Sequence, residues 1–161
     1  MKVELYLGLG SNMGDRAKNI SDAISCLDMK LGRPFKAVSS VIETEPWGFE
    51  AECRFLNAVV LYELEFRDGY NAQVEGLMIL ETCKEIESML GRVGKPEYDG
   101  EGERIYSSRP IDIDILFLGG SRIDCPELTV PHKLMAEREF VMVPLREIAS
   151  ENIRNEFGDI F

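Results

Sequence analysis

Apolar and polar residues alternate at the start of the chain and then change to a helical spacing. Every second residue from Val3 to Leu9 is apolar, which predicts a strand that ends at the glycine-bearing turn 10–14. From about Asp15 to Leu31, apolar residues recur every three or four positions, and Gly32 is typical of the residue that follows a helix. The chain therefore opens with a strand, a turn and an amphipathic helix.

The middle of the chain indicates two more strands and a second helix. Runs rich in β-formers at 35–42 and 55–63 predict strands, and the loop Thr44–Gly48 separates them because its proline and glycine interrupt a strand. A second helical pattern covers 71–90, with Gly91 as its stop.

The last third begins with a polar, glycine-containing loop at 92–110, followed by alternating isoleucines that predict a strand over 111–117. Four short elements are expected after it: a hairpin arm at 121–124, a helical turn at 134–138, a strand at 140–143 and a helical tail from Pro144.

The order β-α-β-β-α-β with a hairpin extension predicts an α+β fold, a ferredoxin-like split βαβ sandwich. Its sheet should be mostly antiparallel, with the helices packed on it, and a doubly wound parallel sheet is the alternative. No repeat or linker divides the 161 residues, so we expect a single domain over 1–161.

The composition limits which binding partners and which cellular location we expect. With 18 basic and 29 acidic side chains the formal charge is −11, which disfavours nucleic acid and means that any bound phosphate needs a local cationic pocket. The four cysteines match no zinc or disulfide spacing, which indicates reduced thiols in the cytoplasm. No signal peptide or membrane span is apparent. We expect small-molecule substrates and, by default, a monomer.

The segment Arg109-Pro110-Ile111-Asp112-Ile113-Asp114 carries the strongest chemical signal. Strand alternation sends Asp112 and Asp114 to one face, with Cα atoms about 6.6–7 Å apart, so that their carboxylates can converge on Mg²⁺. The alternative is an edge strand with a solvated acidic face.

Basic residues precede this strand at Arg92, Lys95, Arg104 and Arg109. Guanidinium groups match phosphate oxygens, so these residues could clamp a polyphosphate. Acidic residues share the segment, which leaves an ordinary charged surface loop as the alternative.

The only histidine, His132, follows Pro131, and Arg138 lies six residues further on. The two could form an anion site, although a lone loop histidine is often simply exposed.

Phe55 and Phe140 each open a predicted strand, so their rings could enclose a flat heterocycle whose polar edge Asn57 would contact. Both rings could equally be ordinary core. The glycines of 8–14 do not have the spacing of a dinucleotide-binding turn and favour a structural turn.

Six motifs occur in order along the chain: Gly10-Ser11-Asn12, Thr44-x-Pro46-x-Gly48, Phe55-Leu56-Asn57, Leu90-Gly91-Arg92, Arg109-x-x-Asp112-x-Asp114 and Val130-Pro131-His132. Together they resemble the 6-hydroxymethyl-7,8-dihydropterin pyrophosphokinase family of folate biosynthesis. The resemblance runs from residue 3 to about 149.

The resemblance implies that a substrate hydroxymethyl oxygen attacks the β-phosphorus of ATP and that AMP leaves, with two Mg²⁺ ions held by Asp112 and Asp114 and charge stabilised by Arg92 and Arg109. The ATP-binding residues that it implies are Glu87, Arg92, Lys95, Arg104, Tyr106, Arg109, Ile113, Thr129, His132 and Arg138. The pterin-binding residues that it implies are Thr44, Pro46, Trp47, Gly48, Phe55, Asn57 and Phe140.

Three other classes fit parts of the sequence. A non-catalytic ferredoxin-like module would bind ATP without consuming it. A nicotinamide-dependent oxidoreductase would require a parallel sheet and a ribose-binding acid after the second strand. An RNA-binding domain is disfavoured by the negative charge and by the lack of an aromatic strand motif.

Overall fold

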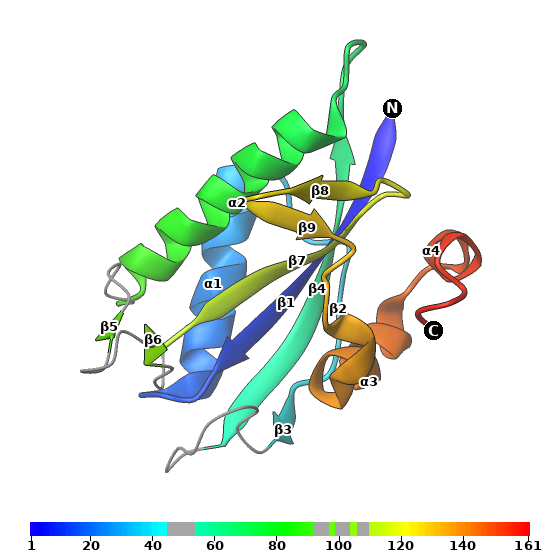
Figure 1. The fold of residues 1–161 in the computed structure, drawn as a ribbon. Helices are drawn as coiled ribbons and strands as arrows, with labels where there is room; N and C mark the ends of the chain where they lie inside the picture. The colour runs from blue at the N-terminus through cyan, green and yellow to red at the C-terminus, as the bar shows by residue number, and fades with distance from the viewer. Residues whose placement is uncertain (45–53, 92–96, 99–103, 106–109) are drawn as a thin grey trace.

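A computed structural model describes residues 1–44, 54–91, 97–98, 104–105 and 110–161 (Figure 1). Its main sheet has the strand order β2-β4-β1-β7, and β3 pairs with the start of β4. These strands are β1 (Lys2–Ser11), β2 (Ala37–Val38), β3 (Ile42–Thr44), β4 (Phe55–Glu65) and β7 (Asp112–Leu118).

All neighbouring strands of this sheet are antiparallel. The order is that of a ferredoxin-like split βαβ fold, which confirms the predicted α+β class. The alternative prediction of a doubly wound parallel sheet is wrong. The oxidoreductase alternative required such a parallel sheet, so the fold does not support it.

Two long helices, α1 (Arg16–Leu31) and α2 (Ala72–Met89), pack on one face of the sheet (Figure 1). Each begins at a side-chain cap: the Asp15 carboxylate accepts a hydrogen bond from the Lys18 N–H at 3.2 Å, and the Asn71 side chain accepts one from Val74 N–H at 3.1 Å. Gly32 ends α1 in the left-handed conformation, as the sequence predicts.

The opposite face is covered by the segment 135–161 (Figure 1). Here η1 (Met135–Glu137), α3 (Glu139–Ile148) and α4 (Glu151–Glu156) pack on Tyr6, Val59 and Phe117. A bulge in the β1–β7 pairing between Tyr6 and Leu7 brings Phe117 opposite Tyr6, so both rings lie on this face. The sheet therefore has a buried core on each side.

The predicted strand over 140–143 is wrong, because these residues form the first turns of α3. A short apolar run fits a strand or a helix equally well, and the packing partner decides. Val141, Met142 and Leu145 lie on one side of a helix that contacts β4, and Pro144 lies inside that helix rather than at the start of a new one.

The predicted strand over 35–42 is divided into β2 and β3 by Ser39. Its N–H donates to the Val59 carbonyl at 2.9 Å, but its hydroxyl, rather than a backbone carbonyl, accepts the Val59 N–H at 2.8 Å. A side chain thus replaces one rung of the ladder and interrupts the strand.

Two small hairpins complete the fold. β8 (Ile123–Cys125) pairs with β9 (Leu128–Val130) as the predicted hairpin extension, and β5 (Glu97–Tyr98) pairs with β6 (Arg104–Ile105) inside the segment expected to be a loop. In the described residues, no helix combines the length and apolar character needed to cross a membrane. Cys26, Cys83 and Cys125 are free thiols, and Cys53 lies outside the described residues.

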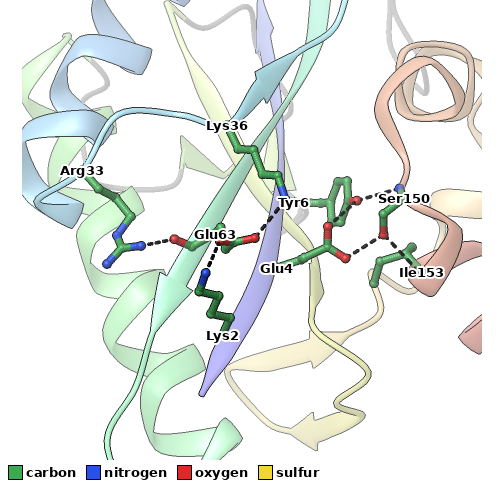
Figure 2. Close-up of polar contacts among 8 residues, drawn as sticks. All are labelled: Lys2, Glu4, Tyr6, Arg33, Lys36, Glu63, Ser150 and Ile153. Atoms are coloured by element: carbon green, nitrogen blue, oxygen red, sulfur yellow. Dashed lines mark hydrogen bonds and ion pairs between the residues drawn. The ribbon is translucent and has the colours of Figure 1, made fainter.

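A polar network on β1 and β4 joins the C-terminal helix to the sheet (Figure 2). Glu4 and Glu63 face each other in the register, and Lys36 lies 2.9 Å from the Glu63 carboxylate. The Ser150 hydroxyl donates to Glu4 at 2.6 Å and accepts the Ile153 N–H at 3.3 Å, which caps α4. The Ser150 N–H donates to the Tyr6 hydroxyl at 2.9 Å.

Phe157→Ala should lower the free energy of unfolding by about 3–5 kcal/mol, because the Phe157 side chain is fully buried and its loss leaves a cavity. Phe35→Ala is the matched control, since Phe35 is 39% exposed, and should cost about 1 kcal/mol. Chemical denaturation measures both, and equal losses would show that the C-terminal segment adds nothing to the core.

Candidate active site at one end of the sheet

The candidate site is built on a row of three residues across neighbouring strands. In the register, Gly10 of β1 lies opposite Asp112 of β7 on one side and Asn57 of β4 on the other. The next row places Gly8 between Asp114 and Val59. Residues opposite each other in a sheet point to the same face, so both aspartates and Asn57 share the face that α3 covers.

The two aspartates lie on the same face of β7, as strand alternation predicts. Ile113, between the aspartates, and Ile115, after them, are buried in the core beneath α1 and α2. Both aspartates remain half-buried. The residues facing the aspartates on β1 are glycines, so no side chain from β1 fills the space above Asp112 and Asp114.

His132 lies beside this acidic pair. Its backbone N–H donates to the Leu116 carbonyl at 3.1 Å, which fixes the residue next to β7, and its Nε2 lies 4.0 Å from Asp114 Oδ2. Burial, followed by the positive charge of Arg138, lowers the pKa of the His132 imidazole, against a smaller opposite influence of Asp112. Its buried Nδ1 atom has no hydrogen-bond partner among the described residues.

Arg138 and Phe140 come to the site from the start of α3. The Arg138 guanidinium lies 5.7 Å from the centre of the Phe140 ring, and Phe140 is half-buried. Phe140 was expected to open a strand, but it lies in the first turn of a helix packed on the sheet. Its half-buried side chain packs against the core between the sheet and the C-terminal helices.

The β4 end of the row is fixed by one strong hydrogen bond. Asn57, only 5% exposed, donates from Nδ2 to Thr44 Oγ1 at 2.7 Å, which joins the ends of β3 and β4. A Cβ atom on residue 10 would lie 3.2 Å from Asn57 Oδ1 and 3.6 Å from Phe55 Cδ1. Glycine at position 10 therefore lets Asn57 and Phe55 approach β1 closely.

Two of the predicted ATP-binding residues, Ile113 and Glu87, meet on the opposite side of β7. The Ile113 side chain is in the core, and its N–H donates to the buried Glu87 carboxylate of α2 at 2.9 Å. Thr129 is exposed on β9. Glu87 thus accepts the hydrogen bond of a backbone N–H on the outer edge of β7. Burial, together with the negative charges of Glu87 and Asp114, raises the pKa of the nearby Cys83 thiol.

Several predicted residues are not placed. Pro46, Trp47, Gly48, Arg92, Lys95, Tyr106 and Arg109 lie outside the described residues, and for Arg104 only the backbone of β6 is described. Within the described part of the chain, no three or more His, Cys, Asp or Glu side chains form a metal cage.

The sequence places Gly8 and Gly10 in a turn, and Gly10 also in one of the six motifs, but it does not predict that both face the aspartates. Their spacing of two matches that of Asp112 and Asp114, but this match becomes meaningful only when the two strands are known to pair.

The fold and the site together define an α+β protein of ferredoxin-like topology with a pair of half-buried carboxylates at one end of its sheet. A sequence model of the 7,8-dihydro-6-hydroxymethylpterin-pyrophosphokinase (HPPK) family matches residues 6–150. The chain therefore belongs to this family.

Curated relatives have the same family name. The chain is 40% identical over 146 residues to a 2-amino-4-hydroxy-6-hydroxymethyldihydropteridine pyrophosphokinase of Porphyromonas gingivalis, with 90% of each sequence covered. It is 34% identical to the Bacillus subtilis protein of that name, covering 91% of this chain and 78% of the relative.

A solved structure shares the fold. A crystal structure of HPPK-DHPS in complex with substrates has a TM-score of 0.61 and 15% sequence identity, covering 99% of this chain and 43% of the other. At this identity the match supports the fold, which agrees with the strand order described above.

Glu87→Ala should lower the free energy of unfolding by about 1–3 kcal/mol, because it leaves the buried Ile113 N–H without its acceptor. Glu85→Ala on the same helix removes an exposed pair with Lys30 and should change stability by less than about 0.5 kcal/mol. Hydrogen exchange at the Ile113 amide should quicken only in the first variant. Unchanged exchange there would refute the role of Glu87 at the strand edge.

Proposed function

We propose that this protein transfers the β,γ-diphosphate of ATP to the hydroxymethyl group of 6-hydroxymethyl-7,8-dihydropterin. The hydroxymethyl oxygen forms a bond to the β-phosphorus, the bond from that phosphorus to the α,β-bridging oxygen breaks, and AMP and a proton are released. The products are the diphosphate ester of the pterin and AMP, which makes the reaction a step of folate biosynthesis.

One observation carries this proposal: Asp112, Gly10 and Asn57 form a single row across three strands. Adjacent strands are about 4.7–4.9 Å apart, so the acidic pair and the amide lie about 10 Å from each other across the row. A pterin held at the Asn57 end can therefore extend its hydroxymethyl group toward a phosphate held at the aspartates.

The acidic pair suits Mg²⁺. This ion prefers oxygen ligands and is commonly bound by one or two carboxylates together with substrate phosphates and water. Asp112 and Asp114 supply two such carboxylates on one half-buried face. When bound, Mg²⁺ would neutralise phosphate charge and orient the reacting groups.

The other predicted site residues would bind the pterin at the Asn57 end of the row and the phosphates at the aspartate end. Phe55 and Phe140 would contact the faces of the pterin, and Asn57 with Thr44 would bind its polar edge. His132 and Arg138 lie on the aspartate side, where their donors suit phosphate oxygens. Arg92 and Arg109, outside the described residues, would stabilise charge on the transferred group.

Incubation of the protein with Mg-ATP and 6-hydroxymethyl-7,8-dihydropterin should yield AMP in a one-to-one ratio with the pterin consumed, because attack is at the β-phosphorus. Separation of nucleotides by ion-exchange chromatography measures this ratio. Production of ADP instead would indicate an ordinary kinase. ATP binding without turnover would favour the non-catalytic module.

Asp114→Asn should lower kcat by at least about a hundredfold, because an amide binds Mg²⁺ far more weakly than a carboxylate does. Asp124→Asn removes an exposed carboxylate from the β8–β9 hairpin and should leave kcat unchanged. Steady-state assays over a range of Mg²⁺ concentrations test both variants. If Asp114→Asn keeps near-normal activity, its assignment as a metal ligand is wrong.

A further inference from the structure

Arg16, the first residue of α1, contacts both strands that carry the proposed pterin residues. Its Nη1 donates to the backbone carbonyl of Arg54 at 2.7 Å and lies 3.1 Å from Glu43 Oε2. Glu43 immediately precedes Thr44, and Arg54 immediately precedes Phe55. Arg54 also lies 3.9 Å from Glu43, so the three residues form one charged cluster.

The start of α1 is itself fixed to the end of β1. The Asn19 side chain donates to the Ser11 hydroxyl at 3.3 Å and to the Met13 carbonyl at 2.9 Å, which fixes the turn between β1 and α1. Arg16 is only 28% exposed in its side chain and extends from this fixed point. Through its contacts with Glu43 and Arg54, Arg16 therefore attaches the ends of β3 and β4 to the end of β1.

The β3 strand needs such an attachment. It has only three residues and, among the described strands, pairs only with β4, through Ile42, Glu43 and Thr44. A short edge strand is weakly held by its backbone ladder, so contacts outside the ladder decide where its end lies. The position of Thr44 matters because it accepts the Asn57 amide hydrogen bond at 2.7 Å.

We infer that Arg16 is a positioning residue for pterin binding: it holds Thr44, Phe55 and Asn57 in place against the end of β1. This inference rests on the proposed function. The role needs arginine, because a guanidinium has several donors in fixed directions and so can serve a backbone carbonyl and a carboxylate at once. Lysine offers a single ammonium at the end of a flexible chain.

The test compares Arg16→Ala and Arg16→Lys with Lys18→Ala. Lys18 lies in the same first turn and forms an exposed pair with Asp22 at 2.7 Å, so it controls for loss of a charge from α1. Arg16→Ala should raise the KM for the pterin about tenfold, by loss of a charge-assisted hydrogen bond. Arg16→Lys should lie between Arg16→Ala and wild type, and Lys18→Ala should match wild type.

The KM for ATP and the kcat at saturating pterin should stay within about twofold of wild type in all variants, because Asp112 and Asp114 are on the far strand of the row. A purely structural role for Arg16 would instead lower activity toward both substrates in parallel with the melting temperature. That parallel loss, or an unchanged KM for the pterin, would overturn the inference.

Direct binding of 6-hydroxymethyl-7,8-dihydropterin, measured by its fluorescence, needs no turnover and separates the two proposals. Wild-type protein that binds the pterin but releases no AMP overturns the proposed reaction alone. Equal affinity in wild type and Arg16→Ala, or no pterin binding by wild type, overturns the role of Arg16. Weaker binding in Arg16→Ala with normal binding in Lys18→Ala supports it.

Discussion

The pairing of β1 with a strand on each side is the constraint on which the rest of the structure depends. β1 pairs with β4 over all ten of its residues and with β7 on its other edge. Because strand side chains alternate, a slip of one residue in either pairing would move every side chain to the opposite face. The register therefore decides both the two hydrophobic cores and the residues that meet at the end of the sheet.

The two faces of the sheet differ in polarity. The face beneath α1 and α2 is a continuous apolar core, in which Ile113 and Ile115 hold β7. The other face is apolar beneath α3 and α4 but becomes polar at one end, where Asp112 and Asp114 lie. α3 connects the two regions, because Val141, Met142 and Leu145 pack in the apolar region while Arg138, just before the helix, acts on His132 beside Asp114.

The net charge of the protein is negative, but positive side chains lie at both ends of the proposed site. A formal charge of −11 would repel nucleotides at long range, so cations must be supplied at the site itself. Burial, followed by the positive charge of Arg138, lowers the pKa of His132, whose Nε2 lies 4.0 Å from Asp114 Oδ2. At the β4 end, Arg16 balances the charge of Glu43. The proposed Mg²⁺ would complete this neutralisation at Asp112 and Asp114.

The sequence by itself determined the main strands, both long helices and the shared face of Asp112 and Asp114, because each follows from a periodicity within a few residues. Tertiary structure alone decided that 140–143 is helical, since an apolar run of that length fits either element until its packing partner is known. It also decided that Gly10 lies between Asp112 and Asn57, and that Arg16 reaches β3 and β4. These contacts join residues tens of positions apart, and no local pattern records the register between distant strands.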